Sequence, residues 1–220
     1  MASKKAVLFD LDGTLINSLP DISHCMNEAL KTHGLPIHPI EAYCYFTGDG
    51  AANLTRRALG PAHQDMYDAV YADYRTLYAA HCNDTSHVYD GIPELLDALH
   101  RAGLRLAVLS NKDDGDVASV IAHYLPGAPF ELLRGRRPGV PIKPDPAAAL
   151  SIAKEMGLTP DDFWYLGDTP TDCQTCQNAG MHLIAAGWGF RPEKELREAG
   201  AERVAATPLD ALQMMLEVSI

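Results

Sequence analysis

Two aspartates at the end of an apolar strand are the residues of this chain best placed to do chemistry. Four apolar residues with strand propensity, 6–9, run directly into Asp10, and Asp12 follows two positions later. Gly13 then lets the chain turn sharply. A carboxylate at the mouth of a sheet is costly unless a cation or a hydrogen-bond donor meets it. The pair therefore indicates a metal site, a proton-transfer task or both.

Two other structures could produce the same string of residues. One is a plain turn between a strand and a loop, which the sequence leaves open. The other is a calcium loop between two helices, which needs glycine at its sixth position and glutamate at its twelfth. Counted from Asp10, the glycine is fourth, and the preceding run is strand-like. A calcium loop is therefore disfavoured.

The strands predicted further along the chain also end in polar residues. Residues 104–109 form a second buried run that ends at Ser110 and Asn111, and residues 163–166 form another that ends at Asp168. Further strands are predicted at 130–133, 182–186 and 204–206. Helices are predicted between them at 92–102, 115–124, 146–156, 171–179 and 209–217. This alternation predicts an α/β fold with a doubly wound parallel sheet, whose site lies outside the carboxyl ends of the strands.

A helical segment separates the first strand from the rest of the predicted sheet. Helices are expected there at 17–33, 51–59 and 63–82. No convincing strand is expected between residues 15 and 88, so the segment looks like an insertion. We predict a core domain built from residues 1–15 and 89–220, and a helical cap domain of residues 16–88.

The composition narrows the classes of partner. The 220 residues include 29 acidic and 18 basic side chains, a formal charge of -11, which disfavours nucleic acid and anionic membranes as partners. No apolar run reaches membrane-spanning length, and the first one ends at Asp10, too early for a signal segment. Five cysteines are a sparse and odd set, typical of reduced thiols. We expect a soluble cytoplasmic protein, either a monomer or a homodimer.

Four short motifs follow one another along the chain. They are Asp10-Leu11-Asp12-Gly13-Thr14, the strand-end Ser110, Lys143-Pro144-Asp145-Pro146, and Gly167-Asp168-Thr169-Pro170-Thr171-Asp172. In order and in kind they resemble the motifs of the haloacid dehalogenase-like (HAD) superfamily, most of whose members are phosphatases. The resemblance implies an α/β core with an inserted cap and the hydrolysis of a phosphate monoester.

The resemblance also implies a separate role for each charged residue. Asp10 would be the nucleophile that attacks phosphorus to give an aspartyl-phosphate, and Asp12 the general acid and later the general base. Two like charges repel by about 4 kcal/mol at 4 Å and an effective dielectric constant of 20, so cations must offset the carboxylates and the phosphate. Lys143 would be one cation. Mg²⁺ would be another, held by Asp10, Asp168 and the backbone carbonyl of Asp12, with Asp172 steadying its surroundings.

Further residues are predicted to hold the phosphoryl oxygens as charge develops. They are Ser110, Asn111 through its backbone amide and side chain, and the turn residues Gly13 and Thr14. Other roles stay open for two of the motifs. Ser110 and Asn111 could cap a helix, and Asp172 could be a charge that stabilises a helix N-terminus.

Three strings resemble the phosphoglycolate phosphatase-like group more specifically. They are Ser110-Asn111-Lys112, Lys143-Pro144-Asp145-Pro146 and Gly187-Trp188-Gly189-Phe190-Arg191. Within the cap, the loop Gly48-Asp49-Gly50 and the cation Arg56 could reach a substrate carboxylate. The alternative is a helix start followed by two solvated arginines, Arg56 and Arg57. The predicted substrate is a small phosphorylated metabolite such as phosphoglycolate.

Other activities remain open. A sugar phosphomutase or a pyrophosphatase of the same superfamily is one alternative, and a phosphate- or metal-binding regulatory protein without turnover is another. A dehalogenase would lack the second carboxylate, Asp12. A phosphonate hydrolase would use a cap lysine, whereas Lys31 is the one lysine of the cap segment. Cys173 and Cys176 have the spacing of a redox or zinc pair, but no second pair completes a zinc site, so we interpret both as helix packing.

Overall fold

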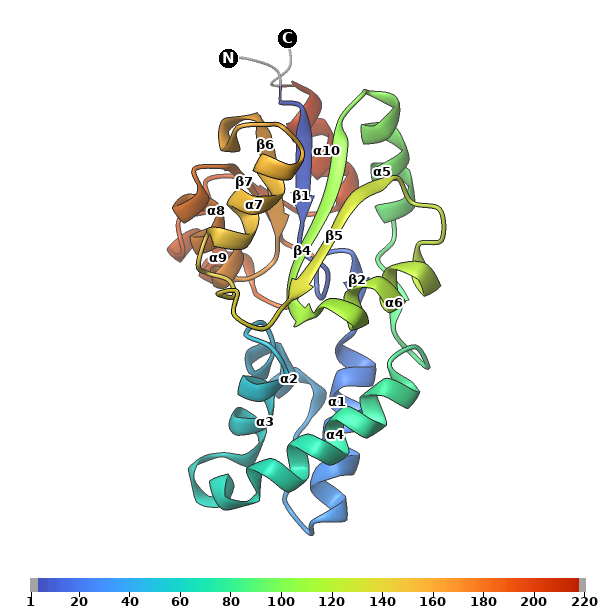
Figure 1. Ribbon diagram of the computed structural model, residues 1–220, viewed down its shortest axis with the longest axis vertical. Coiled ribbons are helices and arrows are strands. Elements are labelled where there is room, and N and C mark those ends of the chain that lie inside the picture. The colour runs from blue at the N-terminus through green and yellow to red at the C-terminus, as the bar shows by residue number, and fades with distance from the viewer. Residues whose placement is uncertain (1–3, 218–220) are drawn as a thin grey trace.

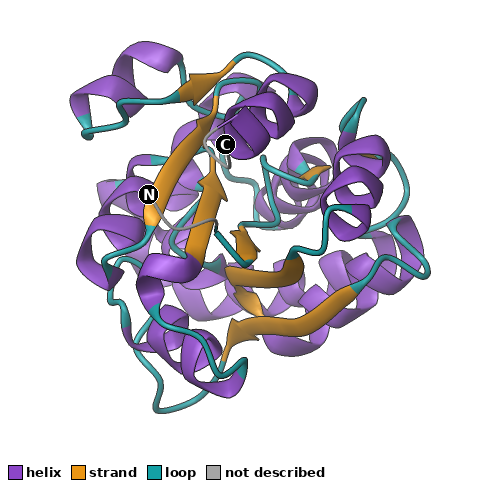
Figure 2. Cartoon of the chain, turned by 90° about the horizontal axis from the view of Figure 1, so that it is seen from above, coloured by secondary structure: helices purple, strands orange, loops and turns teal. Residues whose placement is uncertain are grey.

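Residues 4–217 are described by a computed structural model, in which a six-stranded sheet carries helices on both of its faces (Figures 1 and 2). The strands are β1 (Ala6–Phe9), β4 (Arg105–Asp113), β5 (Phe130–Arg136), β6 (Phe163–Gly167), β7 (His182–Ala186) and β8 (Val204–Ala205). Their order is β5-β4-β1-β6-β7-β8, and every neighbouring pair is parallel. The predicted α/β fold with a doubly wound sheet is confirmed.

Apolar side chains alternate between the two faces of the sheet and bury helices on both. One face carries α5 (Ile92–Arg101), α6 (Asp114–Tyr124) and α10 (Pro208–Glu217). The other carries α7 (Ala147–Glu155) and α8 (Pro170–Ala179), with the short α9 (Glu193–Glu198) beside α8 and the 3-10 turn η2 (Pro160–Asp162) before β6. In β1, Val7 and Phe9 pack toward the first face, and Ala6 and Leu8 toward the second. A strand buried on both sides has a continuous apolar sequence, which made β1 predictable.

β1 lies at the centre of the sheet, between β4 and β6. Phe9 is level with Val108 of β4 and with Leu166 of β6. The residues that follow these positions therefore meet at one edge of the sheet. Strand order reverses here, since β4 and β6 lie on opposite sides of β1. Asp10 and Asp168 each follow their strand directly and so occupy this edge.

Four α-helices and one 3-10 helix form a separate group beyond that edge of the sheet (Figure 1). The group contains α1 (Leu19–Thr32), α2 (Ile40–Phe46), α3 (Ala51–Leu59), the 3-10 helix η1 (Pro61–Met66) and α4 (Tyr67–His81). It has its own apolar cluster, which includes Met26, Tyr43, Leu54 and Val70, and Phe190 from the loop after β7 joins it. Among the described residues, none of the helices is both long and apolar enough to cross a membrane.

Two short strands correct the expectation that residues 15–88 contain no strand. β2 (Ile16–Asn17) and β3 (His87–Val88) pair antiparallel where the chain enters and leaves the helical group. Each has two residues, too few to show the alternation that identifies a strand. Helices α2 and α9 are also missing from the prediction. With seven and six residues they are shorter than the span over which helical periodicity can be read.

The division into a core of residues 1–15 and 89–220 and a cap of residues 16–88 stays a prediction. Residues 1–3 and 218–220 of that division lie outside the described residues. Within the described part, the pairing of β2 with β3 is the place where the two segments of chain between core and helices run side by side.

All five cysteines are free thiols. Cys173 and Cys176 are buried in α8, where Cys173 packs with Ala185 and Leu196. Burial raises the pKa of each of the two thiols to about 12. A thiol that does not ionise near neutral pH is unreactive, so the pair suits helix packing rather than redox chemistry.

Asp21 ties the first helix to the segment that returns to the core. Its buried carboxylate accepts hydrogen bonds from the backbone N–H of Thr85 and of Ser86, each at 2.9 Å, and from the hydroxyl of Thr85. Burial opposes ionisation, but the hydrogen bonds from Ser86 and Thr85 outweigh it and lower the pKa of Asp21. The ionised carboxylate therefore stabilises this junction.

We expect Asp21→Asn to lower the free energy of unfolding at pH 7 by about 1–3 kcal/mol, because an amide accepts these hydrogen bonds less well than a carboxylate. A lowered pKa stabilises the fold above the unfolded value of about 4, and that contribution is lost as pH falls through the folded value. Urea unfolding at pH 7 and pH 3 should show a difference from wild type that shrinks in acid. The control is Asp97→Asn, at an exposed position of α5. A difference of equal size at both pH values would contradict this role.

Candidate active site

The carboxyl edge of the sheet gathers charged or polar residues from all four motifs. Asp10 follows β1, Ser110 lies within β4, and Asp168 follows β6. Lys143 lies in the loop before α7, and Asp172 lies in the first turn of α8. Each of these five residues is buried, with at most 6% of its surface exposed. The fold thus brings together residues that are widely separated in the chain.

Lys143 is held between two of the carboxylates. Its Nζ lies 2.9 Å from Oδ1 of Asp10 and 2.7 Å from Oδ1 of Asp172. Burial acts to lower the pKa of Lys143, but the charges of Asp10 and Asp172 outweigh it and raise the pKa well above its usual value. Lys143 is therefore a permanent cation beside Asp10.

Asp172 is fixed by hydrogen bonds to both of its oxygens. Oδ1 accepts from Lys143 and from the hydroxyl of Tyr165 at 3.1 Å. Oδ2 accepts from the backbone N–H and the hydroxyl of Thr169, at 3.1 and 2.6 Å. Asp172 and Thr169 also form a capping box at the start of α8. Asp172 therefore stabilises the N-terminus of α8, as the alternative interpretation proposed. It also forms an ion pair with Lys143.

Asp168 is oriented by the turn that follows β1. The hydroxyl of Thr14 donates to its Oδ1 at 3.0 Å, and the backbone N–H of Phe190 donates to its Oδ2 at 2.8 Å. Gly13 has a φ of 87°, and a Cβ there would collide with the carboxylate of Asp168. The N–H of Gly13 donates to the carbonyl of Ile16 at 2.8 Å. The turn and Asp168 use these donors in this structure, and the expectation that Thr14 and the Gly13 amide hold phosphate stays a prediction.

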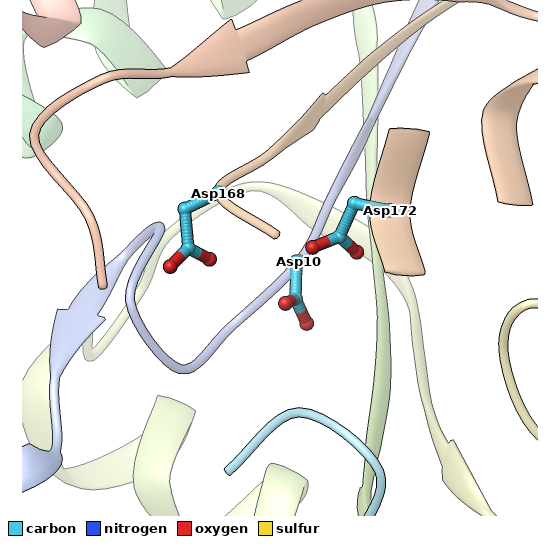
Figure 3. A group of neighbouring side chains, drawn as sticks. All are labelled: Asp10, Asp168 and Asp172. Carbon is cyan, nitrogen blue, oxygen red and sulfur yellow. The ribbon is translucent and has the colours of Figure 1, made fainter. Parts of the chain in front are cut away.

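Three carboxylates converge at this edge, those of Asp10, Asp168 and Asp172 (Figure 3). One oxygen of each lies within 4.8 Å of the others. Burial and then the charge of Asp172 raise the pKa of Asp10 to about 7, against the effect of Lys143, and the same two causes raise the pKa of Asp168 well above its usual value. Three acids and one lysine leave a surplus of buried negative charge. A hard divalent cation that prefers oxygen ligands fits this surplus.

The donor set favours Asp10 and Asp168 as direct metal ligands. Each oxygen of Asp172 already accepts two hydrogen bonds, so this residue suits a supporting position beside a metal. The side chain of Asp12 is not part of the three-carboxylate cluster found among the described residues. Asp12 is predicted to contribute its backbone carbonyl to a metal site. The ion pair between its carboxylate and Lys112 does not involve that carbonyl.

The carboxylate of Asp12 is paired with a lysine for which the sequence predicted no role. Nζ of Lys112 lies 2.9 and 3.2 Å from the two oxygens of Asp12, and 2.6 Å from the hydroxyl of Tyr78 on α4. Ser110 and Lys112 share a side of β4, because residues two apart in a strand face the same way. That period could have placed Lys112 in the site. Tyr78 lies in a helix rich in tyrosine, and no sequence signal distinguishes it from its neighbours.

Asn111 connects three segments of the chain around the site. Its side-chain nitrogen donates to the carbonyl of Gly48 at 2.9 Å and to that of Lys143 at 3.1 Å, and its oxygen accepts from the N–H of Lys143 at 2.8 Å. The hydrogen-bonding groups of this side chain all contact backbone atoms, and the expectation that Asn111 holds phosphate stays a prediction. Helix capping by Ser110 and Asn111 is not observed either, since α6 begins after Asp113.

The carboxyl edge and the helical group together line a cavity. The core contributes polar and charged lining residues, which include Asp10, Asp12, Ser110, Asn111, Lys112 and Lys143. The helical group contributes mainly apolar and aromatic ones, which include Ile22, Thr47, Gly48, Gly50, Ala51, Leu54, Tyr74 and Tyr78. A small ligand in this cavity would therefore meet charge on one side and apolar surface on the other.

Gly48 and Gly50 of the loop Gly48-Asp49-Gly50 line the cavity, but Arg56 does not. Asp49 accepts a hydrogen bond from the hydroxyl of Thr171 at 3.3 Å and pairs with Arg57, so the loop rests on the start of α8. The guanidinium of Arg56 is exposed and lies 4.5 Å from the ring centroid of Tyr67. Arg56 is not among the residues that line the cavity, and its binding of substrate stays a prediction.

The chain is similar in sequence and in fold to known proteins. Residues 7–186 match the family model of haloacid dehalogenase-like hydrolases. A phosphoglycolate phosphatase from Pseudomonas putida is 32% identical over 191 residues, which cover 84% of this chain and 70% of the relative. A crystal structure from Lactobacillus delbrueckii subsp. bulgaricus has a TM-score of 0.92 and 28% identity, covering 97% of this chain and 98% of the other. That of a predicted phosphoglycolate phosphatase from Haemophilus somnus has a TM-score of 0.90 and 26% identity, covering 97% and 99%.

Proposed function

The chain belongs to the haloacid dehalogenase-like hydrolases as a phosphatase of the phosphoglycolate phosphatase-like group, and we propose that it hydrolyses a small phosphate monoester through an aspartyl-phosphate on Asp10, with Mg²⁺ as cofactor. The substrate that this proposal favours is phosphoglycolate or an ester of similar size. A relative that is 32% identical and described as a phosphoglycolate phosphatase supports this choice.

One observation carries the proposal: two carboxylates with different partners face the same cavity. Asp10 is buried beside Lys143 and the other acids of the three-carboxylate cluster. Asp12 lies outside that cluster and pairs with Lys112. Two acids in unlike surroundings can take unlike roles, one as nucleophile and one in proton transfer.

In the first half of the proposed reaction, an oxygen of Asp10 forms a bond to phosphorus and the bond from phosphorus to the ester oxygen breaks. Asp12 donates its proton to that leaving oxygen. Lys143 and the hydroxyl of Ser110 lie where they can hold the phosphoryl oxygens as negative charge develops. The side chain of Asn111 positions Lys143 by hydrogen bonds to the backbone N–H and the backbone carbonyl of that lysine.

In the second half, Asp12 removes a proton from water, and the water oxygen attacks phosphorus to release inorganic phosphate and restore the Asp10 carboxylate. Mg²⁺, when bound by Asp10, Asp168 and the backbone carbonyl of Asp12, would neutralise charge on the phosphoryl group. Asp172 would support the metal site and Lys143 by its hydrogen bonds. Residues 16–88 would act as a cap that keeps bulk water from the intermediate.

A panel of phosphate esters assayed with and without Mg²⁺ tests the proposal. We expect phosphate release from phosphoglycolate and from an aryl phosphate, loss of activity with a chelator, and recovery when Mg²⁺ is added back. Because the carboxylate cluster carries surplus negative charge, chelation should reduce turnover by at least about 100-fold.

The alternatives predict different results in the same panel. A non-catalytic binding protein would release no phosphate from any ester at any pH with Mg²⁺ present. A phosphomutase would convert a sugar phosphate into its isomer, which product analysis would detect. A pyrophosphatase would act on pyrophosphate in preference to the monoesters. Any of these outcomes would overturn the proposed reaction.

A further inference from the structure

One short loop contacts both the three-carboxylate cluster and the helical group. It is the segment 187–191, which connects β7 to α9. The proposed reaction gives no role to any side chain of this loop. Phe190 is buried and lines the cavity. The loop therefore joins the two parts of the molecule at the site itself.

The first half of the loop is fixed to the core. The indole Nε1 of Trp188 donates to the backbone carbonyl of Thr14 at 3.0 Å, and its ring packs on an apolar cluster of the sheet. Gly189 lies directly against Asp168, because a Cβ at this glycine would collide with that side chain. This close approach brings the backbone N–H of Phe190 to 2.8 Å from Oδ2 of Asp168.

The second half of the loop is fixed to the helical group. The side chain of Phe190 belongs to the apolar cluster of that group, and among the described residues it is the one buried member from outside residues 16–88. The guanidinium of Arg191 lies 4.3 Å from the ring centroid of Tyr45 on α2. Glu195 of α9 contacts both of these side chains, at 3.3 and 3.0 Å. Phe190 thus contacts Asp168 through its backbone and the helices through its ring.

The orientation of Asp168 depends on the hydrogen bonds that it accepts. Oδ1 accepts from the hydroxyl of Thr14, and Oδ2 accepts from the N–H of Phe190. Each carboxylate oxygen has a further lone pair that can bind a cation. Loss of a hydrogen bond that orients a metal ligand typically lowers metal affinity by about 10- to 100-fold. Because the N–H and the ring belong to one residue, the packing of the ring restricts where the N–H can lie.

We propose that Phe190 is a positioning residue for the metal site: the packing of its ring in the helical group keeps its N–H on Asp168, and this raises the affinity of the site for Mg²⁺. None of the three carboxylates of the cluster comes from the helical group. The helical group nevertheless contributes to the binding of the cation through Phe190. This inference rests on the metal site of the proposed function and adds a residue that controls it.

The test is calorimetric titration of the full chain with Mg²⁺ alone, without substrate. Phe190→Ala should raise the Kd for Mg²⁺ by about 10-fold. Phe190→Leu, which keeps a large apolar side chain in the cluster, should recover most of the affinity.

The matched control is Leu59→Ala. Leu59 is a buried member of the same apolar cluster and is not among the residues that line the cavity. The substitution should lower thermal stability about as much as Phe190→Ala does, because both leave a cavity in one cluster. It should leave the Kd for Mg²⁺ within about twofold of wild type, since its effect is independent of Asp168. Metal affinity therefore separates positioning of Asp168 from a general loss of packing.

A second measurement needs no variant. Mg²⁺ added to wild type should shift the NMR resonance of the Phe190 amide and slow its hydrogen exchange, because a bound cation fixes the carboxylate that accepts this hydrogen bond. An amide of Phe190 that saturating Mg²⁺ leaves unchanged would overturn the inference, even if Phe190→Ala fails to fold.

The outcomes distinguish this inference from the proposed function. An unchanged Kd in Phe190→Ala, or an equal rise in Leu59→Ala, would overturn the role of Phe190 and leave the phosphatase function standing. The expected pattern of Kd values in a protein that releases phosphate from no ester would support the role of Phe190 and overturn the phosphatase function. Absence of Mg²⁺ binding by wild type would overturn the metal site and this inference together.

Discussion

Asp10→Asn is expected to lower turnover by about 10⁴-fold or more, which corresponds to about 5.5 kcal/mol of lost transition-state stabilisation. An amide oxygen does not attack phosphorus to give a stable acyl-phosphate, and it removes one negative charge from the proposed metal site. No neighbouring carboxylate can take over either role. Asp12 is held by Lys112, and Asp172 is held by Lys143 and Thr169.

The fold of Asp10→Asn should survive. Burial and the charge of Asp172 raise the pKa of Asp10 to about 7. The ionised carboxylate therefore destabilises the folded protein at pH values above the ordinary pKa of an aspartate. Asparagine relieves that repulsion and can still accept the hydrogen bond that Leu11 N–H donates to Oδ1 at 2.7 Å. Phosphate release, circular dichroism and thermal unfolding should be measured beside Asp97→Asn, an exposed control. Activity within tenfold of wild type would contradict the nucleophile assignment.

Asp12→Asn is expected to have the second largest effect, about 10² to 10⁴-fold on the hydrolysis of phosphoglycolate. The proton that Asp12 donates matters most for a poor leaving group such as an alkoxide. An aryl phosphate has a better leaving group, so its first step should be affected less, while the second step still lacks its general base. The variant should therefore accumulate phosphorylated enzyme.

Rapid mixing of Asp12→Asn with an aryl phosphate should show this accumulation as a burst of released phenol, with an amplitude near one equivalent of enzyme, followed by slow turnover. Wild type under the same conditions should show a smaller burst or none. A slow rate for Asp12→Asn without any burst, equal for alkyl and aryl esters, would contradict the proton-transfer role.

The sequence predicted the elements that carry the site because each has a strong local pattern. β1 and β6 are continuous apolar runs that end in aspartate, and the spacing of the four motifs along the chain is itself informative. The three-carboxylate cluster follows from the topology, since parallel strands on either side of β1 place their ends at one edge.

The hydrogen bonds within the site could not be read from the same patterns. The hydroxyl of Thr14 and the side chain of Asn111 have the chemistry to bind phosphate, but the tight turn and the neighbouring backbone take them first. The contact of Lys112 with Tyr78 depends on how α4 lies against the core, and helical periodicity does not fix that orientation. Arg56 has the right charge, yet its place on α3 turns it toward Tyr67.

The most direct measurement is to identify the residue that becomes phosphorylated. Asp12→Asn is mixed with Mg²⁺ and an aryl phosphate labelled at phosphorus, quenched in acid, reduced with borohydride and analysed by peptide mass spectrometry. The proposed reaction predicts label released by hydroxylamine from the unreduced protein, and reduction of residue 10 to homoserine. Two results would contradict the proposed reaction, provided that wild type turns over the same ester. One is an unmodified Asp10, and the other is label on another residue.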